Sequence, residues 1–116
     1  MRKSLLVAVI GLGLVAPAFA HSPLKKTVPA DGAELAEAPE TITFRFGKDA
    51  RLTKVIVERA DAGEQIRLEL PTKSFAQTFE MQGVPQDAGV YQVRWRALGE
   101  DGHMLTGSFG YTVAPR

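Results

Sequence analysis

Short segments in which apolar and polar residues alternate are the feature that most limits what this chain can fold into. Residues 41–46 (Thr-Ile-Thr-Phe-Arg-Phe) place three apolar side chains on one face and three polar ones on the other, and residues 91–97 alternate in the same way. A period of two residues is typical of a β-strand with one buried face, and no segment after residue 20 shows the 3.6-residue period of an amphipathic helix over any length. The sequence therefore predicts an all-β protein.

Seven short strands are expected, separated by turn signals rich in Gly, Pro and Asp. Three apolar side chains are expected to align in the fourth strand (Ile66, Leu68, Leu70) and three in the fifth (Phe75, Phe79, Met81), and Trp95 is expected to anchor the core. Strands with one apolar face suit antiparallel sheets packed face to face, so the prediction is a seven-stranded antiparallel β-sandwich. The expected strands are residues 24–28, 41–46, 54–59, 65–70, 75–81, 91–97 and 108–113.

The first twenty residues predict a cleaved signal peptide. Arg2 and Lys3 precede an apolar run, Pro17 interrupts it, and Ala18-Phe19-Ala20 matches the small-x-small pattern of a cleavage site. The apolar region is shorter than the about 20 residues of a membrane span, and an uncleaved membrane anchor is the alternative interpretation. The expected organisation is a signal peptide over residues 1–20 and one exported domain over residues 21–116, without membrane insertion of the mature chain.

Composition excludes several functions. The chain has no cysteine, so an exported fold must rely on packing instead of disulfides, and thiolate is not available as a metal ligand. All 13 acidic residues but only 12 of the 14 basic ones follow residue 20, and no basic run is present. This near-neutral balance argues against nucleic acid or anionic lipid as a partner. No nucleophile–base pair, phosphate loop or paired carboxylates are evident, so no catalytic residue is expected.

The two histidines, His21 and His103, predict a metal site. Cleavage after Ala20 would make His21 the amino terminus, and its amine and Nδ1 would then chelate one ion in a six-membered ring. Asp101 and His103 are candidate partners that would complete an N,N,N,O ligand set. The competing interpretation is that Asp101-Gly102 only forms a hairpin turn, although a turn can also present ligands at a sandwich edge.

A nitrogen-rich tetragonal ligand set favours Cu(II). Soft Cu(I) would require thioethers or thiolates, and the chain has no methionine cluster. Met81 is expected to pack in the core, while Met104 either lies near the ion or fills a gap in the core.

Residues 21–116 resemble the CopC-type copper-resistance proteins of the bacterial periplasm. The resemblance rests on His21-Ser22-Pro23-Leu24, on residues 27–33 and 39–46, and on a specific block over residues 89–97 (Gly-Val-Tyr-Gln-Val-Arg-Trp-Arg-Ala) that is followed by Asp101-Gly102-His103 and by residues 106–109 (Thr-Gly-Ser-Phe).

This resemblance implies a Greek-key, immunoglobulin-like β-sandwich that carries Cu(II) through His21, Asp101 and His103. It also implies a periplasmic protein of copper resistance, copper homeostasis or copper delivery to an inner-membrane transporter of the CopD type, without catalysis. The Met-rich Cu(I) loop of some members is not expected, since residues 51–70 contain neither Met nor His. Two other functions remain open: a small copper monooxygenase with a terminal histidine brace, and a metal-free β-sandwich adaptor that binds a protein partner.

Overall fold

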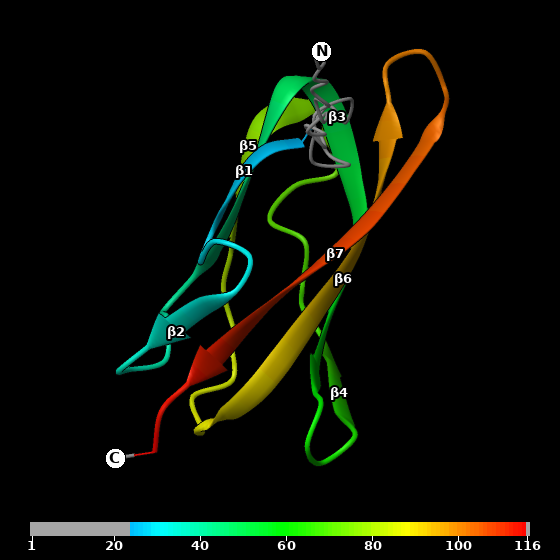
Figure 1. The fold of residues 1–116 in the computed structure, drawn as a ribbon. Coiled ribbons are helices and arrows are strands. Elements are labelled where there is room, and N and C mark those ends of the chain that lie inside the picture. The colour runs from blue at the N-terminus through cyan, green and yellow to red at the C-terminus, as the bar shows by residue number, and fades with distance from the viewer. Residues whose placement is uncertain (1–23, 116) are drawn as a thin grey trace, which may run out of the picture.

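The computed structural model of the protein describes residues 24–115, which form an all-β fold of seven strands (Figure 1). Within this part of the chain, no helix is long and apolar enough to cross a membrane. The strands are β1 (Leu24–Val28), β2 (Ala33–Leu35), β3 (Ile42–Arg59), β4 (Glu64–Arg67), β5 (Ala76–Met81), β6 (Gly89–Gly99) and β7 (Met104–Val113).

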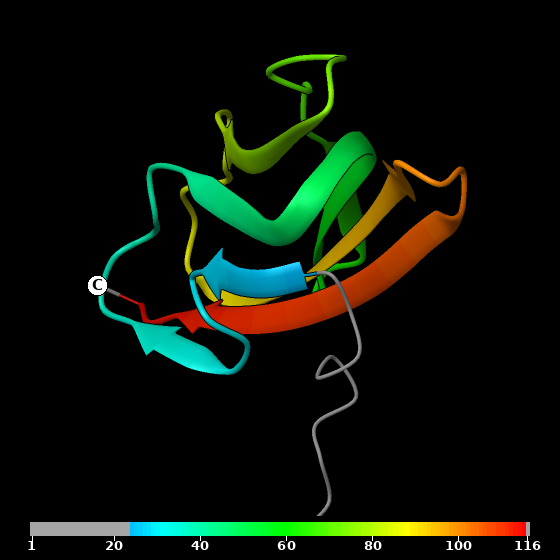
Figure 2. The ribbon, with the colours of Figure 1, turned by 90° about the horizontal axis from the view of Figure 1, so that it is seen from above.

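The long strand β3 belongs to both layers of the sandwich. Its first half pairs antiparallel with β1 and β5, with Phe44 opposite Thr27 and Phe79. Its second half pairs antiparallel with β6 and β4, with Ile56 opposite Arg94 and Arg67. Figures 1 and 2 show β3 arching from one layer to the other. We call β1, the first half of β3 and β5 the first layer, and β4, the second half of β3, β6, β7 and β2 the second layer.

The sequence predicted two separate strands, 41–46 and 54–59, where the structure has the single strand β3. The alternation fails at residues 47–49 because the strand passes between the layers there, and it resumes at the buried residues Ala50 and Leu52. A strand that changes layers has no constant buried face. The two halves therefore appear in the sequence as two short strands.

The expectation of a wholly antiparallel sandwich is wrong for one pair. β2, which the sequence did not predict, runs parallel to β7, with Ala33 opposite Tyr111, so the sheet is mixed. The loop before β2 is fixed to β7 by two hydrogen bonds: the N–H of Gly32 donates to the carbonyl of Gly110 (2.7 Å), and the N–H of Gly110 donates to Oδ1 of Asp31 (2.9 Å). A strand of three residues is too short to show a period of two.

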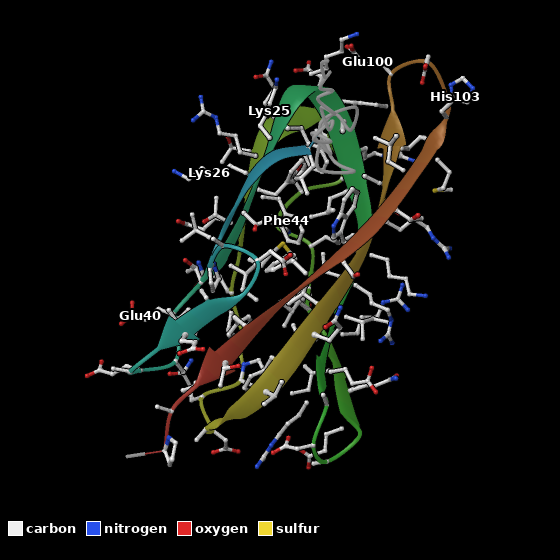
Figure 3. All side chains as sticks on the ribbon, viewed as in Figure 1. Lys25, Lys26, Glu40, Phe44, Glu100 and His103 are labelled. Atoms are coloured by element: carbon white, nitrogen blue, oxygen red, sulfur yellow. The ribbon has the colours of Figure 1, made fainter. Side chains whose placement is uncertain are left out.

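The core lies between the two layers, as the position of Phe44 in Figure 3 illustrates. Trp95 is only 5% exposed, which confirms its predicted role, and Phe44 packs edge-on against Trp95 and Phe109 with ring centroids 6.2 and 5.8 Å apart. This geometry is favourable for aromatic rings because a positive edge meets a negative face. Of the other predicted core residues, Phe79, Met81 and Leu68 are buried, whereas Ile66 and Phe75 are exposed.

Candidate metal centre

A tight turn between β6 and β7 carries Asp101 and His103. The two strands pair as far as Leu98 and Met104, and the N–H of Gly99 then donates to the carbonyl of His103 at 2.8 Å. Within the turn, the N–H of Gly102 donates to the carbonyl of Gly99 at 3.0 Å, and Gly102 has a φ of 87°, which glycine adopts without a steric penalty. The turn predicted from Asp101-Gly102 is therefore present.

The turn brings the two predicted ligands into contact. Oδ1 of Asp101 accepts a hydrogen bond from the backbone N–H of His103 at 3.0 Å, and Oδ2 lies 2.8 Å from Nδ1 of the imidazole. Both side chains face solvent, His103 at 80% exposure and Asp101 at 69%. Because the carboxylate contacts Nδ1, the other ring nitrogen, Nε2, is turned away from Asp101. A carboxylate in this position fixes the tautomer and the orientation of a histidine that binds a metal.

The contact changes the acidity of both groups. The hydrogen bond to Asp101, together with the negative charge of the carboxylate, raises the pKa of His103 above its usual 6.5. The hydrogen bonds that His103 donates lower the pKa of Asp101 below its usual 3.8. Asp101 is thus an ionised carboxylate throughout the neutral pH range. This is the form required of a side chain that binds a metal or holds a metal-binding histidine.

The turn lies at the same end of the sandwich as the start of β1. In Figure 1 the first residues of β1, the bend of β3 and the β6–β7 turn are all at the upper end, and Figure 3 shows His103 there beside Glu100. The strand register also places the bend of β3 at the end that carries the turn, because Ala50, just after the bend, is opposite Gly99 at the start of the turn. β1 and β7 also border one groove of about 260 Å³, whose lining includes Leu24 and Ser108.

The third predicted ligand, His21, lies outside the described residues, as does the predicted cleavage site. Across residues 24–115, Asp101 and His103 are brought together, but no group of three or more His, Asp or Glu side chains is placed to hold a metal ion. A site built on this turn therefore requires donors from elsewhere.

Met104 does not fill a gap in the core. It is 57% exposed and follows His103 on the outer face of the second layer, whereas Met81 is buried as predicted. The sequence did not predict this exposure because the expected strand began at residue 108, whereas β7 begins at Met104 and its alternation turns Met104 outward.

The fold and the turn together define a class: small two-layer β-sandwich proteins that present an aspartate–histidine pair at one end. The chain belongs to the CopC family, since the sequence model of the CopC domain matches residues 24–114. Among sequence relatives, the copper resistance protein C of Escherichia coli is 28% identical over 97% of both chains, and the protein YobA of Escherichia coli K12 is 29% identical over 92% of this chain and 90% of its own.

Solved structures show the same fold. CopC of Methylosinus trichosporium OB3b superimposes with a TM-score of 0.66 at 21% identity, over 80% of this chain and 93% of its own. PcoC of Escherichia coli, described as a methionine-rich copper resistance protein, superimposes with a TM-score of 0.58 at 25% identity, over 78% of this chain and 96% of its own.

Proposed function

We propose that this protein binds Cu(II) in the periplasm and carries or buffers it in copper resistance, with His21, Asp101 and His103 as the ligands. Copper is its cargo, and binding and release are its activity. The contact between Asp101 and His103, in an exposed turn at the end of the sandwich where β1 begins, is the observation on which this proposal rests.

The path of the chain supports a contribution from His21. β1 is antiparallel to the first half of β3, and both β1 and β7 lead away from the end that carries the turn. β1 therefore begins at the end of the sandwich that carries the turn. His21 precedes Leu24 by three residues, which span about 10 Å when extended, and the proposal requires this segment to bring the His21 donors to the turn.

The chemistry of the donors fits Cu(II). An α-amine and an imidazole, whose ordinary pKa values are about 8 and about 6.5, both lose their protons to a metal at neutral pH, and copper(II) leads the divalent affinity order for nitrogen donors. A solvent-exposed site on a chain end and a turn also gives the ion a direct route in and out. A carrier requires such a route, whereas a buried resident cofactor does not.

The relatives support the same cargo. Copper resistance protein C and PcoC of Escherichia coli are both described as copper resistance proteins, and this chain aligns with the first of them over 97% of its length. By this analogy we assign residues 1–20 to a cleaved signal peptide and residues 21–116 to the exported copper-binding domain. An inner-membrane copper transporter of the CopD type is the proposed recipient, and no catalytic role is proposed.

The test compares protein that begins at His21 with protein that carries one additional Met before it. Copper titration followed by electron paramagnetic resonance is expected to show tight binding and nitrogen hyperfine coupling in the first form and a large loss of affinity in the second, because the extension removes the free amine. His103→Ala is expected to lose affinity in both forms. Equal affinity of the two forms would refute the role of His21.

A further inference from the structure

The outer face of the second layer carries a dense set of basic residues. The register of β3, β6 and β7 places Lys54 beside Arg96, and Ile56 beside Arg94, in adjacent rows on this face. The second-layer basic face, as we name it, consists of Arg51, Lys54, Arg67, Arg94 and Arg96. In Figure 3, nitrogen-tipped side chains project to the right of β6 and β7.

Among the residues that the structure describes, one of these five cations forms an ion pair with a carboxylate. Glu58 of β3 forms an ion pair with Arg94 of β6. No ion pair to Lys54 or Arg96 is present within residues 24–115, although the two lie directly opposite each other in neighbouring strands. Like charges in this arrangement destabilise a sheet. The fold tolerates this electrostatic cost, although packing does not require two basic residues at these positions.

Three apolar residues near the turn border this face, Leu98 and Met104 on β6 and β7 and Phe75 beside Arg51 of β3. Leu98 and Met104 are opposite each other in the last β6–β7 pair before the turn, and Arg51 is opposite Leu98 on the other side. The guanidinium of Arg51 lies 5.8 Å from the centre of the Phe75 ring, which is 43% exposed. Exposed Phe and Met beside Arg is the composition of the centre of a protein–protein interface and not that of an ordinary solvated surface.

We infer that the second-layer basic face, together with the apolar strip of Phe75, Leu98 and Met104, docks an acidic protein surface during copper transfer. This inference rests on the proposed function. The strip borders the turn that holds Asp101 and His103, so a protein seated on it lies beside the site. The unpaired cations then attract and orient a surface of opposite charge.

A protein surface fits this face better than an anionic membrane does. The chain after residue 20 has one more acidic than basic residue, so its acidic remainder opposes approach to an extended negative plane. A partner of protein size senses mainly the charges within a Debye length of about 8 Å, which on this face are basic.

The first experiment measures copper transfer from the loaded protein to two synthetic peptides with the same copper chelator, one flanked by glutamates and one by serines. Stopped-flow rates at low salt are expected to favour the glutamate peptide by roughly tenfold, and 0.5 M salt should largely remove the preference. The double variant Lys54→Glu/Arg96→Glu is expected to abolish the preference.

The matched control is Lys26→Glu/Arg45→Glu. Lys26 and Arg45 are also opposite each other in neighbouring strands, but in the first layer, and their reversal changes the net charge equally. This control should keep most of the preference, and equal loss in both variants would overturn the inference. A neutral variant, Lys54→Gln/Arg96→Gln, provides the test if the reversed pair does not fold.

Two further measurements separate this inference from the proposed function. All of these variants should bind copper with the same affinity. If the docking inference is wrong, the unaltered protein still binds copper. If the proposed function is wrong, the unaltered protein does not bind copper. The glutamate peptide should shift the amide signals of Arg96 and Met104 and not those of Lys26 and Arg45. If the protein sediments with phosphatidylglycerol vesicles, and this binding depends on Lys54 and Arg96, the partner of this face is a membrane and the inference of a protein partner is overturned.

Discussion

Asp101 acts on His103 through both of its carboxylate oxygens. One oxygen accepts from the backbone N–H and the other engages Nδ1, so the ring is held relative to the turn itself. The two pKa shifts make the stability of the fold depend on pH. The raised pKa of His103 gives a contribution to stability that is present below pH 6.5 and is lost as the pH rises through the raised value. The lowered pKa of Asp101 gives a second contribution to stability, which is lost as the pH falls through the lowered pKa.

Asp101→Asn is expected to return the pKa of His103 towards 6.5, because the amide keeps a hydrogen-bond acceptor but removes the negative charge. The measurement is an NMR titration of the imidazole signals of the copper-free protein. Glu100→Gln, at the neighbouring turn position, is the control and should leave the midpoint nearly unchanged. A midpoint in the unaltered protein at or below 6.5 would contradict the contact.

Two stacked tyrosines in the core differ in how their hydroxyls are satisfied. The rings of Tyr91 and Tyr111 lie 5.2 Å apart with an interplanar angle of 20°. The hydroxyl of Tyr91 donates to the carbonyl of Asp87 at 2.7 Å, whereas the buried hydroxyl of Tyr111 has no hydrogen-bond partner among the described residues. Burial raises the pKa of both phenols.

Removing these hydroxyls should therefore have unequal effects. Tyr91→Phe is expected to lower the free energy of unfolding by about 1 kcal/mol, because it removes a made hydrogen bond and leaves a carbonyl without a donor. Tyr111→Phe is expected to be neutral or stabilising, since it removes a desolvated polar group. Urea denaturation followed by Trp95 fluorescence measures both. A loss in Tyr111→Phe as large as that in Tyr91→Phe would show that its hydroxyl is satisfied.

At the scale of the element, the β6–β7 hairpin joins the core to the candidate site. Gly107 is opposite Trp95 in the register, and a Cβ added at Gly107 would lie 2.6 Å from Cζ2 of the indole. The ring can pack against the β7 backbone only because this position has no side chain. The hairpin therefore depends on one glycine for its inner face and on Gly102 for its turn.

Gly107→Ala is expected to destabilise the protein by about 1–3 kcal/mol, the usual cost of overpacking a filled core. Ser108→Ala, the next residue on the exposed face, is the control and should stay within about 0.5 kcal/mol. Thermal unfolding followed by near-ultraviolet circular dichroism reports the loss together with the changed environment of Trp95. A Gly107→Ala variant as stable as Ser108→Ala would mean that the indole moves aside freely.

At the scale of the whole molecule, the proposed copper site spans both layers. β1 belongs to the first layer and the β6–β7 turn to the second, so an ion held by His21 and His103 would tie the two layers together at one end. The complete ligand set exists only in the folded state, so copper binds that state more tightly and stabilises the fold, although the chelate of His21 alone persists in the unfolded chain and reduces the gain.

Copper at one hundred times its dissociation constant is therefore expected to stabilise the processed protein by at most about 2.7 kcal/mol. The increase should disappear at pH 5, where protons compete for the amine and imidazoles. Calorimetry of the processed protein, of the form with an added Met and of His103→Ala measures the effect. Stabilisation of all three forms alike would place the ion elsewhere.

The sequence alone determined the turn and the strand-forming segments other than β2. Alternation within residues 91–97 predicted β6 and the burial of Trp95, because one strand with one buried face leaves a local trace. Asp101-Gly102 predicted the turn for a similarly local reason, since backbone geometry there depends on the residues themselves. The family also follows from sequence, through motifs that are contiguous in the chain.

The tertiary structure decided what depends on pairing between distant segments. The passage of β3 from one layer to the other and the parallel β2–β7 pair have no local signal, because each is fixed by partners elsewhere in the chain. The same holds for charge. No basic run exists in the sequence, yet strand register gathers Lys54, Arg67 and Arg96 on one face, since residues far apart in the chain become neighbours when their strands pair.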